Sequence, residues 1–413
     1  MTQRRPGVAA EQAGGEPAPP AAVEAVLAAL QEDDVVALAQ ELVRAPGQNP
    51  PGEEEATATA LAAAATARGL GHTRTEVAPG RPNLTVTLDG GHGPGLLLLG
   101  HTDVVPVGDG WTRDPFGGEV AEGRLYGRGA TDMKGGLAAC LVAMHALGRC
   151  GVRLSGPVHL AALADEEQEG IGIRRYVAQE APALLGCVVA EPTDLQTVIA
   201  ARGACYLTID VHGQAAHAGR PSDGRNAIYG AAAVVTDLER WHGELAGRAD
   251  PLVGPPTVNV GTVHGGEGGS IVAARCRIGV DRRLLPEEGI QEVLAAVRER
   301  LARLGLEERG LGWEVTSPMD MPGFRTDPGD PFVGAVDGAL ADAGGPGLPL
   351  AGWTAACDGG FVARQWGVPT VVLGPGSVAD QAHRPDESVG VEELRTAART
   401  YALAALNLLA EPL

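Results

Sequence analysis

Hydrophobic and polar positions along the first third of the chain follow two different periods. Apolar residues recur at helical spacing over residues 22–43, and residues 56–68 consist almost wholly of strong helix formers. Residues 83–88 alternate between apolar and polar, and 96–99 form a short continuous aliphatic run. Both patterns predict strands, the second of them buried. Residues 132–147 then predict a further helix.

Two more aliphatic runs end in acidic residues. Residues 158–164 run directly into the acids at 165–167, and residues 188–190 run into Glu191. Strands that alternate with helices indicate a mostly parallel sheet with helices on its faces. Ligands of such sheets bind at the carboxyl ends of the strands, which is where these acids are expected.

The middle of the chain has a different pattern, with four alternating segments and two helical ones. The strand segments are 206–212, 257–263, 275–282 and 313–316, and the helical segments are 226–241 and 286–304. This is the composition of a small α+β sandwich. Because an aliphatic strand recurs at 369–373, we predict one α/β domain of residues 23–201 and 319–413. The sandwich, residues 202–318, is predicted to be a second domain inserted into it.

Composition indicates a globular protein of two domains with a tail. The chain has 413 residues, of which 44% are hydrophobic and 20% charged. Residues 1–22 are rich in Ala, Gly, Pro and Glu and lack the apolar stretch of a signal peptide. We expect them to be a disordered tail.

Charge and cysteine spacing exclude several classes of function. The 52 acidic residues exceed the 32 basic ones by 20, so the chain would repel nucleic acid and anionic membranes. A small-molecule substrate fits better. The ordinary alternative is that the excess of acidic residues only keeps the protein soluble. The longest aliphatic run, 96–99, is far too short to span a bilayer. Six cysteines without a Cys-x-x-Cys pair argue against a zinc ribbon or disulfide scaffold and favour the cytoplasm.

Candidate chemistry gathers where predicted strands end. The residues concerned are His101, Asp103, Asp132, Glu166, Glu167, Glu191 and His383. Imidazoles and carboxylates without a thiolate suit one or two divalent ions, zinc or cobalt. Each residue alone has an ordinary alternative. Asp132 could cap a helix, and the acids at 165–169 could form a solvated turn.

The adjacent acids Glu166 and Glu167 carry the strongest signal. Neighbouring carboxylates at the mouth of an aliphatic strand repel one another unless a cation or a proton separates them. If Glu167 holds a metal, Glu166 is free to act as a general base on the attacking water. His101 lies two residues before Asp103, so a carboxylate could hold the second nitrogen of a coordinating imidazole.

Seven motifs in order, from about residue 24 to the end, resemble the M20 metallopeptidase family. This group includes acetylornithine deacetylase, succinyl-diaminopimelate desuccinylase, aminoacylase and glutamate carboxypeptidase. The motifs are residues 100–106, 127–135, 165–167, 191–193, 217–221, 281–283 and 374–387.

The resemblance implies a two-metal amide hydrolase and a homodimer. It also implies that residues 23–201 and 319–413 form the metal-binding catalytic domain and that residues 202–318 form a lid or dimerisation domain. The positions that match metal ligands are His101, Asp132, Glu167, Glu191 and His383, with Asp132 the bridge. Glu166 matches the general base, and Asp103 matches the acid that orients the first histidine. His217 matches an oxyanion-stabilising histidine of the smaller domain. Arg283 and Asn259 match substrate-binding positions.

Ordinary interpretations of the inserted-domain residues stay open. His217 could be a turn residue, and Arg283 could pair with Glu287 or Glu288 at the surface.

One departure bears on the substrate. Many relatives carry an arginine where this chain has Gly360, which argues against a doubly acidic succinylated substrate and favours an acetylornithine deacetylase-like deacylase. A dipeptidase or carboxypeptidase, a desuccinylase and a non-catalytic metal-binding homologue remain alternatives. A cysteine hydrolase using Cys357 is disfavoured because no histidine stands near it in a recognisable arrangement.

Overall fold

The computed structural model describes residues 19–411, and the chain divides into two compact units. The first unit contains Met1–Ile199, Thr326–Ala351 and Phe361–Leu413, and the second contains Ala200–Arg325 and Gly352–Gly360. We predicted a tail over residues 1–22, and positions 1–18 of it lie outside the described residues. Its last three residues belong to the first helix.

The helices of the first unit are α1 to α5, α8 and α10, with short helical turns near residues 130 and 360. Their bounds are α1 Pro20–Ala29, α2 Glu32–Arg44, α3 Glu55–Ala67, η1 Ala130–Lys134, α4 Gly135–Arg149, α5 Ile171–Val177, α8 Pro331–Asp342, η5 Val362–Trp366 and α10 Val391–Leu409. The strands of the large sheet are β1 Gly71–Ala78, β2 Arg81–Leu88, β3 Gly95–His101, β6 Val158–Leu163, β7 Leu184–Val189, β8 Val198–Ala201, β13 Phe324–Arg325, β14 Ala351–Trp353 and β15 Thr370–Val372. A small sheet contains β4 Glu119–Ala121, β5 Arg124–Tyr126 and β16 Ser388–Gly390.

The large sheet has the order β1-β2-β6-β3-β7-β15-β8-β13, with β14 paired with β8. Pairing is parallel between β6, β3, β7 and β15, and antiparallel from β1 to β6 and from β15 to β13. The predicted α/β class with helix-flanked sheet is therefore confirmed. The sheet is mixed, and the tight turn between β1 and β2 permits only an antiparallel pair at that edge.

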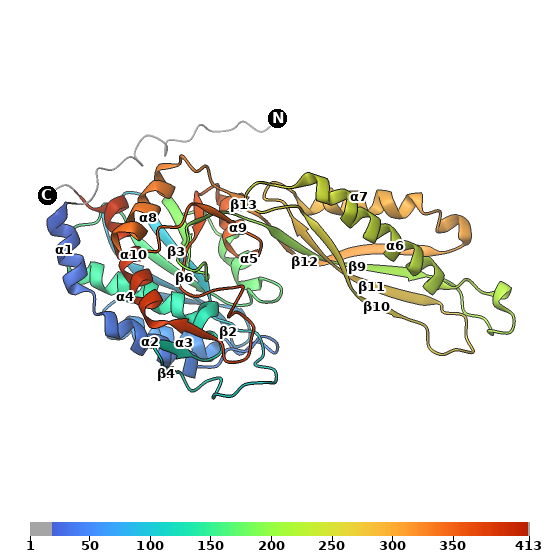
Figure 1. The fold of residues 1–413 in the computed structure, drawn as a ribbon, viewed down its shortest axis with the longest axis horizontal. Helices are drawn as coiled ribbons and strands as arrows, with labels where there is room; N and C mark the ends of the chain where they lie inside the picture. Colours follow the sequence, from blue (N-terminus) through green and yellow to red (C-terminus); the bar gives the residue numbers. More distant parts are fainter. Residues whose placement is uncertain (1–18, 412–413) are drawn as a thin grey trace. The chain divides into compact units, whose positions relative to one another are not determined.

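Helices α4, α8 and α10 pack together beside the central strands (Figure 1). Strand β3 is buried along its whole length, as the aliphatic run predicted. Most of α4 is buried too, since it packs between α2, α10 and the sheet. The core therefore lies directly behind the strand ends that carry the acids.

The single helix predicted over residues 22–43 is in fact two helices. The chain is extended at Leu30 (ψ 115°), and α2 begins afterwards at Glu32. Three acids, Glu32–Asp34, occupy its first turn, where carboxylates are stabilised by the positive end of the helix dipole. The apolar spacing continues across the break, which is why periodicity alone joined the two helices.

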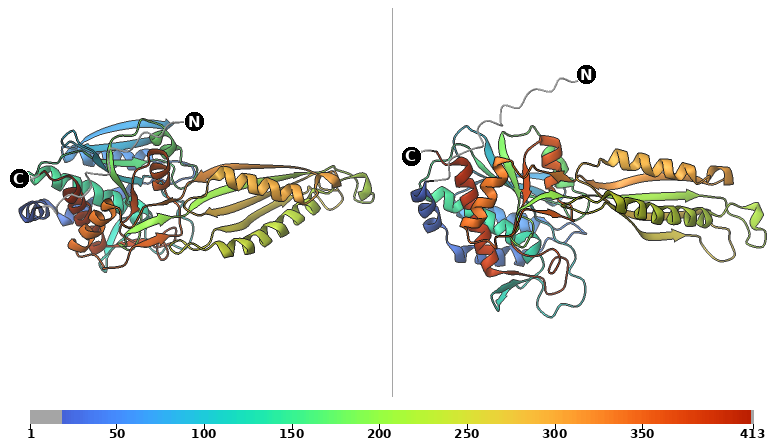
Figure 2. Two further views of the ribbon diagram at one scale, coloured as in Figure 1. Left: turned by 90° about the horizontal axis from the view of Figure 1, so that it is seen from above. Right: turned by 45° about the horizontal axis from the view of Figure 1, so that its top comes forward.

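The second unit is a four-stranded antiparallel sheet with two helices. Its elements are β9 Gly203–His212, η2 Pro221–Asp223, α6 Ala227–Leu245, η3 Ala246–Arg248, β10 Thr257–Gly265, β11 Arg275–Leu284, α7 Ile290–Arg303, η4 Glu307–Arg309, β12 Gly312–Met321 and α9 Gly359–Phe361, of which the last ends in the first unit. The sheet order is β10-β11-β9-β12 (Figure 2). Alternate residues of each strand join α6 and α7 in one apolar core. The opposite face of the sheet is left uncovered by these helices.

Helix α7 begins four residues later than the sequence predicted. Residues 286–289 form a turn, in which the Glu288 N–H donates to the Leu285 carbonyl, and Gly289 is the N-cap. Among the described residues, no helix combines the length and apolar character that crossing a bilayer requires.

Candidate metal centre

His101 ends strand β3 and is almost fully buried, with 1% of its surface exposed. Its Nδ1 lies 2.9 Å from the Asp103 backbone carbonyl, an acceptor, so Nδ1 carries the proton. Nε2 faces Asp132 Oδ1 at 3.2 Å and Glu191 Oε1 at 3.3 Å, where it can offer its lone pair to a cation that replaces its proton. The imidazole is held in the tautomer that a metal ligand needs.

Asp132 faces two histidines with its two oxygens. Oδ1 lies 3.2 Å from His101 Nε2, and Oδ2 lies 3.3 Å from His383 Nε2. Asp132 does not cap a helix, because α4 begins at Gly135 and the backbone at Asp132 is non-helical. One carboxylate therefore lies between two sets of donors, as a bridge between two cations must.

The second set is completed by Glu167, whose Oε1 lies 3.2 Å from His383 Nε2. Donor atoms of Glu166, His101 and Glu191 also lie within 4.8 Å of one another. The structure thus brings together six expected residues, from the ends of the three strands β3, β6 and β7 and from two loops. His383 is the exposed member, with 51% of its side chain accessible.

Distances between donor atoms fit a small divalent ion. Two ligands at about 2.0–2.1 Å from a tetrahedrally coordinated zinc are separated by about 3.3 Å. The four donor pairs described above, between the two histidines and the three acids, are separated by 3.2–3.3 Å. Residues of the right chemical type therefore have a spacing that is compatible with a small divalent ion.

The buried acids bear the electrostatic signature of a cation site. Burial, together with the nearby Asp132, raises the pKa of Glu191 to about 7. Burial and Asp132 also raise the pKa of Glu167. Hydrogen bonds with Asp132 and Glu167 raise the pKa of His383 to about 10. Without a divalent ion, protons supply the positive charge that these crowded carboxylates need.

The turn that carries Glu166 is not a solvated acidic turn. Asp165 is 2% exposed, and the backbone N–H groups of Glu166 and Glu167 donate to the Asp103 carboxylate at 3.1 Å each. Asn49 also donates to Asp103, at 2.9 Å. Asn49 was not singled out from the sequence.

The loop that carries Asp132 is held by another buried acid, Glu387. Its Oε1 accepts the backbone N–H groups of Gly129, Thr131 and Asp132 at 3.0–3.1 Å. Its Oε2 accepts a hydrogen bond from the buried Arg128 guanidinium. Burial raises the pKa of Glu387 to about 7, against the lowering effect of Arg128. Arg128 belongs to the motif 127–135, but its role could not be inferred from the sequence because its partner is 259 positions away.

The expected substrate-contacting residues belong to the second unit. His217 is exposed, and its Nδ1 accepts the Gly219 N–H at 3.0 Å. Arg283 pairs with Asp281 at 2.9 Å, not with Glu287 or Glu288. Asn259 is opposite Asp281 on the neighbouring strand, so Asn259 and Arg283 share the uncovered face of the sheet.

Gly360 has a steric reason to be glycine. A Cβ atom at this position would lie 1.7 Å from the Pro322 carbonyl oxygen, so a side chain does not fit this backbone. The arginine of many relatives is thus excluded here by local packing. Cys357, the alternative nucleophile, is buried, with 1% of its surface exposed.

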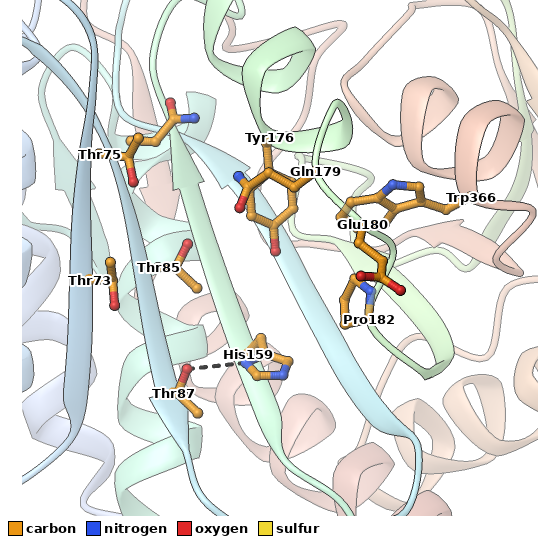
Figure 3. Close-up of a pocket in the computed structure, with 11 residues that line it drawn as sticks. Thr73, Thr75, Thr85, Thr87, His159, Tyr176, Gln179, Glu180, Pro182 and Trp366 are labelled. Carbon is orange, nitrogen blue, oxygen red and sulfur yellow. Dashed lines mark hydrogen bonds between the residues drawn. The ribbon is translucent and has the colours of Figure 1, made fainter.

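A separate pocket of about 310 Å³ lies over β1, β2 and β6 (Figure 3). Its lining residues are Thr73, Thr75, Asn83, Thr85, Thr87, His159, Tyr176, Gln179, Glu180, Pro182 and Trp366. The rings of Tyr176 and Trp366 lie 5.3 Å apart and form one wall. Since its lining includes no candidate ligand, this pocket is distinct from the metal centre.

Comparison with known proteins places this centre in a family. The model of peptidase family M20/M25/M40 matches residues 97–407. Acetylornithine deacetylase of Klebsiella pneumoniae (strain 342) is 36% identical over 310 residues, which are 72% of this chain and 76% of that protein. Acetylornithine deacetylase of Proteus mirabilis (strain HI4320) is 33% identical over 315 residues, 75% of this chain and 78% of that protein.

Solved structures share the fold. An M20 family metallo-carboxypeptidase from Sulfolobus solfataricus superposes with a TM-score of 0.75 at 21% sequence identity, over 91% of this chain and 99% of that one. The family model covers well over half of the chain, and both deacetylases exceed 30% identity. The chain therefore belongs to peptidase family M20/M25/M40.

Proposed function

We propose that the protein is a zinc-dependent hydrolase that cleaves the amide bond of an N-acyl amino acid, most closely in the manner of an acetylornithine deacetylase. The observation that carries the proposal is the Asp132 carboxylate, which faces His101 with one oxygen and His383 with the other. Two donor sets that share a carboxylate suit a pair of divalent ions, zinc first and cobalt second.

Glu166 is the proposed general base. When bound, the two cations would polarise the scissile carbonyl and make the attacking water more acidic. The Glu166 carboxylate accepts the proton of that water and delivers it to the nitrogen of the leaving amine. Its backbone is fixed by Asp103, so the carboxylate stays beside His101 and Glu191.

His217 is the proposed donor to the developing oxyanion. Because Nδ1 accepts the Gly219 N–H, the neutral ring carries its proton on Nε2, where it can donate to a substrate oxygen. Arg283 and Asn259 are proposed to hold the substrate's carboxylate and carbonyl. The guanidinium fork of arginine suits a carboxylate, although Asp281 must then share it.

The acyl preference rests on the deacetylase relatives and on Gly360. The two deacetylases match three quarters of the chain. At position 360 no arginine is available to bind a second carboxylate, which favours an acetyl over a succinyl group.

Changing Glu166 to Gln tests the mechanism. We expect this variant to keep its zinc content, measured by atomic absorption, and to lose turnover of N-acetylornithine by about 10²–10⁴-fold. Glu169→Gln is the matched control, since Glu169 lies on the same turn but is exposed. Near-normal turnover by Glu166→Gln would show that Glu166 is not the base.

A substrate panel tests the class. The zinc- or cobalt-loaded protein is assayed with N-acetylornithine, N-acetylmethionine, N-succinyl-diaminopimelate and a dipeptide, with a chelated control. Chelator-sensitive hydrolysis of N-acetylornithine supports the proposal. Hydrolysis of the dipeptide alone or the succinyl compound alone would replace it with a peptidase or desuccinylase, and no hydrolysis would favour a non-catalytic homologue.

We also propose that residues 202–318 act as a lid and dimerisation domain, in a cytoplasmic homodimer. Exposed apolar side chains support an interface there: Tyr229 is 68% exposed and Ile228 39% on α6, and Val263 is 49% exposed on the edge strand β10. All six cysteines are free, as a reducing compartment requires. Light scattering on the protein and on Tyr229→Glu measures the oligomeric state.

A further inference from the structure

We propose that a buried polar chain positions the catalytic turn of residues 165–167 from behind. The chain of side chains is Glu54, Arg81, Asp165, Asn49 and Asp103. All five are positioning residues, since they act through the turn and not on the substrate. The proposal rests on the proposed function only for the role of Glu166.

Asp103 holds the near end of the turn. Its Oδ1 accepts the Glu166 N–H and its Oδ2 accepts the Glu167 N–H, each at 3.1 Å. The His101 ring is closer to the Asp103 backbone carbonyl, at 2.9 Å, than to its carboxylate, at 3.5 Å. The carboxylate of Asp103 therefore faces the His101 ring and also fixes the backbone of Glu166 and Glu167.

Asn49 links Asp103 to Asp165. Its amide nitrogen donates to Asp103 Oδ2 at 2.9 Å and to Asp165 Oδ1 at 2.8 Å. The side chain is 3% exposed, so no bulk water competes for these bonds. A neutral amide with two donors can join two buried carboxylates, whereas a third acid would repel both.

Asp165 holds the far end of the turn. Its Oδ2 accepts the N–H groups of Glu169 and Ile171, both at 3.2 Å. Asp103 and Asp165 therefore hold the two ends of the turn, and Asn49, which donates to both, fixes the distance between them. Glu166 has little freedom to leave its place as a result.

Arg81 supplies the positive charge for this group. It donates to Asp165 Oδ1 at 2.6 Å and through Nε to Glu54 Oε2 at 2.9 Å. Glu54 is fully buried, and 16% of the Arg81 side chain is exposed. The buried carboxylates of Glu54 and Asp165 thus share one guanidinium, and a buried acid is stable only when a cation compensates it.

The test measures catalysis and local opening in the same zinc-loaded full-length proteins. Asn49→Leu keeps the volume and removes both donors. We expect kcat to fall about 10–100-fold with KM changed less than about 3-fold, as is typical when groups behind a metal site are removed. Amide hydrogen exchange of the segment 164–170 should become faster, and metal affinity, measured by calorimetry, should fall.

Arginine variants provide a matched control. Arg81→Gln should slow catalysis and speed exchange, and Arg81→Lys should restore part of both. Arg74 lies on the adjacent strand and pairs with Glu55, the neighbour of Glu54, but at the surface. Arg74→Gln should therefore behave as wild type in every assay.

The outcomes separate this proposal from the proposed function. Wild-type kcat and exchange in a folded Asn49→Leu would overturn the positioning role. If Asn49→Leu does not fold, the Arg81 variants test the positioning role instead. Equal kcat values for Arg81→Gln and Arg74→Gln would then overturn it. If wild type hydrolyses none of the panel, the proposed function fails, whereas hydrogen exchange still decides whether these residues hold the turn.

Discussion

Several single side chains in the centre each serve two partners. Asp132 faces two histidines, Asp103 accepts two backbone N–H groups, and Asn49 joins two carboxylates. Removing one such group leaves two buried polar partners unsatisfied, each at a cost of about 1–3 kcal/mol. Conservative substitutions at these positions should therefore have large effects.

Gly360 offers a test of packing at the scale of one residue. Gly360→Ala places a Cβ against the Pro322 carbonyl, which we expect to cost about 1–3 kcal/mol or more of stability by overpacking. Chemical denaturation measures the change. Gly338→Ala is the control: it lies within helix α8 with no atom near its added methyl, and should stabilise by up to about 1 kcal/mol. Equal stability of the two variants would contradict the steric account of Gly360.

At the scale of elements, long and strongly patterned segments were predictable from sequence. The buried run of β3 and the two helices and four strands of the second unit have the predicted types. Short or polar strands, such as β1 with its exposed residues, were missed because neither alternation nor burial marks them. Helix α10, although long, was also not identified.

The chemistry of the candidate site was easiest to infer where residues follow strands, whereas Asp132 and His383 were supported mainly by the family motifs. His101 and Glu191 stand directly after aliphatic runs, so their chemistry and place could be inferred together. Asn49 and Arg81 could not be inferred, because their roles depend on partners 54 to 116 positions away along the chain. Contacts between distant segments leave no local pattern in the sequence.

The uncovered face of the second unit's sheet gives a prediction on pH. Hydrogen bonds from Arg277 and Arg275 lower the pKa of Asp210, on the neighbouring strand β9. A lowered native pKa adds stability above the unfolded value of about 3.9, and this stability is lost as pH falls through the native pKa. Asp210→Asn should therefore destabilise at pH 7, by about 1 kcal/mol or less because both arginines are exposed.

The difference between Asp210→Asn and wild type should shrink as pH falls from about 5 towards 3, when Asp210 takes up its proton. Urea unfolding at several pH values measures it. Asp223→Asn, which removes an exposed pair with Arg220, is the control and should have little effect at any pH. A difference that grows on acidification would contradict the assignment.

At the scale of the molecule, the candidate metal centre and the apolar core around α6 and α7 belong to different units. Every candidate metal ligand belongs to the first unit, and the second unit has its own apolar core around α6, α7 and its sheet. Ligands that bind only one folded unit stabilise that unit by mass action.

Removing the metal should therefore affect one unit. In calorimetry, we expect a chelator to lower the temperature at which the first unit unfolds. Zinc at about 1,000 times its Kd contributes about 4 kcal/mol to the free energy of unfolding, and the chelator removes this contribution. The second transition is identified with Trp241→Ala, which empties a site that is 7% exposed and should cost about 3–5 kcal/mol. A chelator shift shared equally by both transitions would contradict this separation.

The long distances in sequence between the metal ligands also determine when the centre can exist during synthesis. His101 emerges from the ribosome early and His383 very late, yet both face the same Asp132 carboxylate. The two donor sets cannot both be complete until most of the polypeptide has been made and folded. Loading with two ions must therefore follow synthesis, and nascent or prematurely terminated chains that lack His383 cannot form the second set of donors.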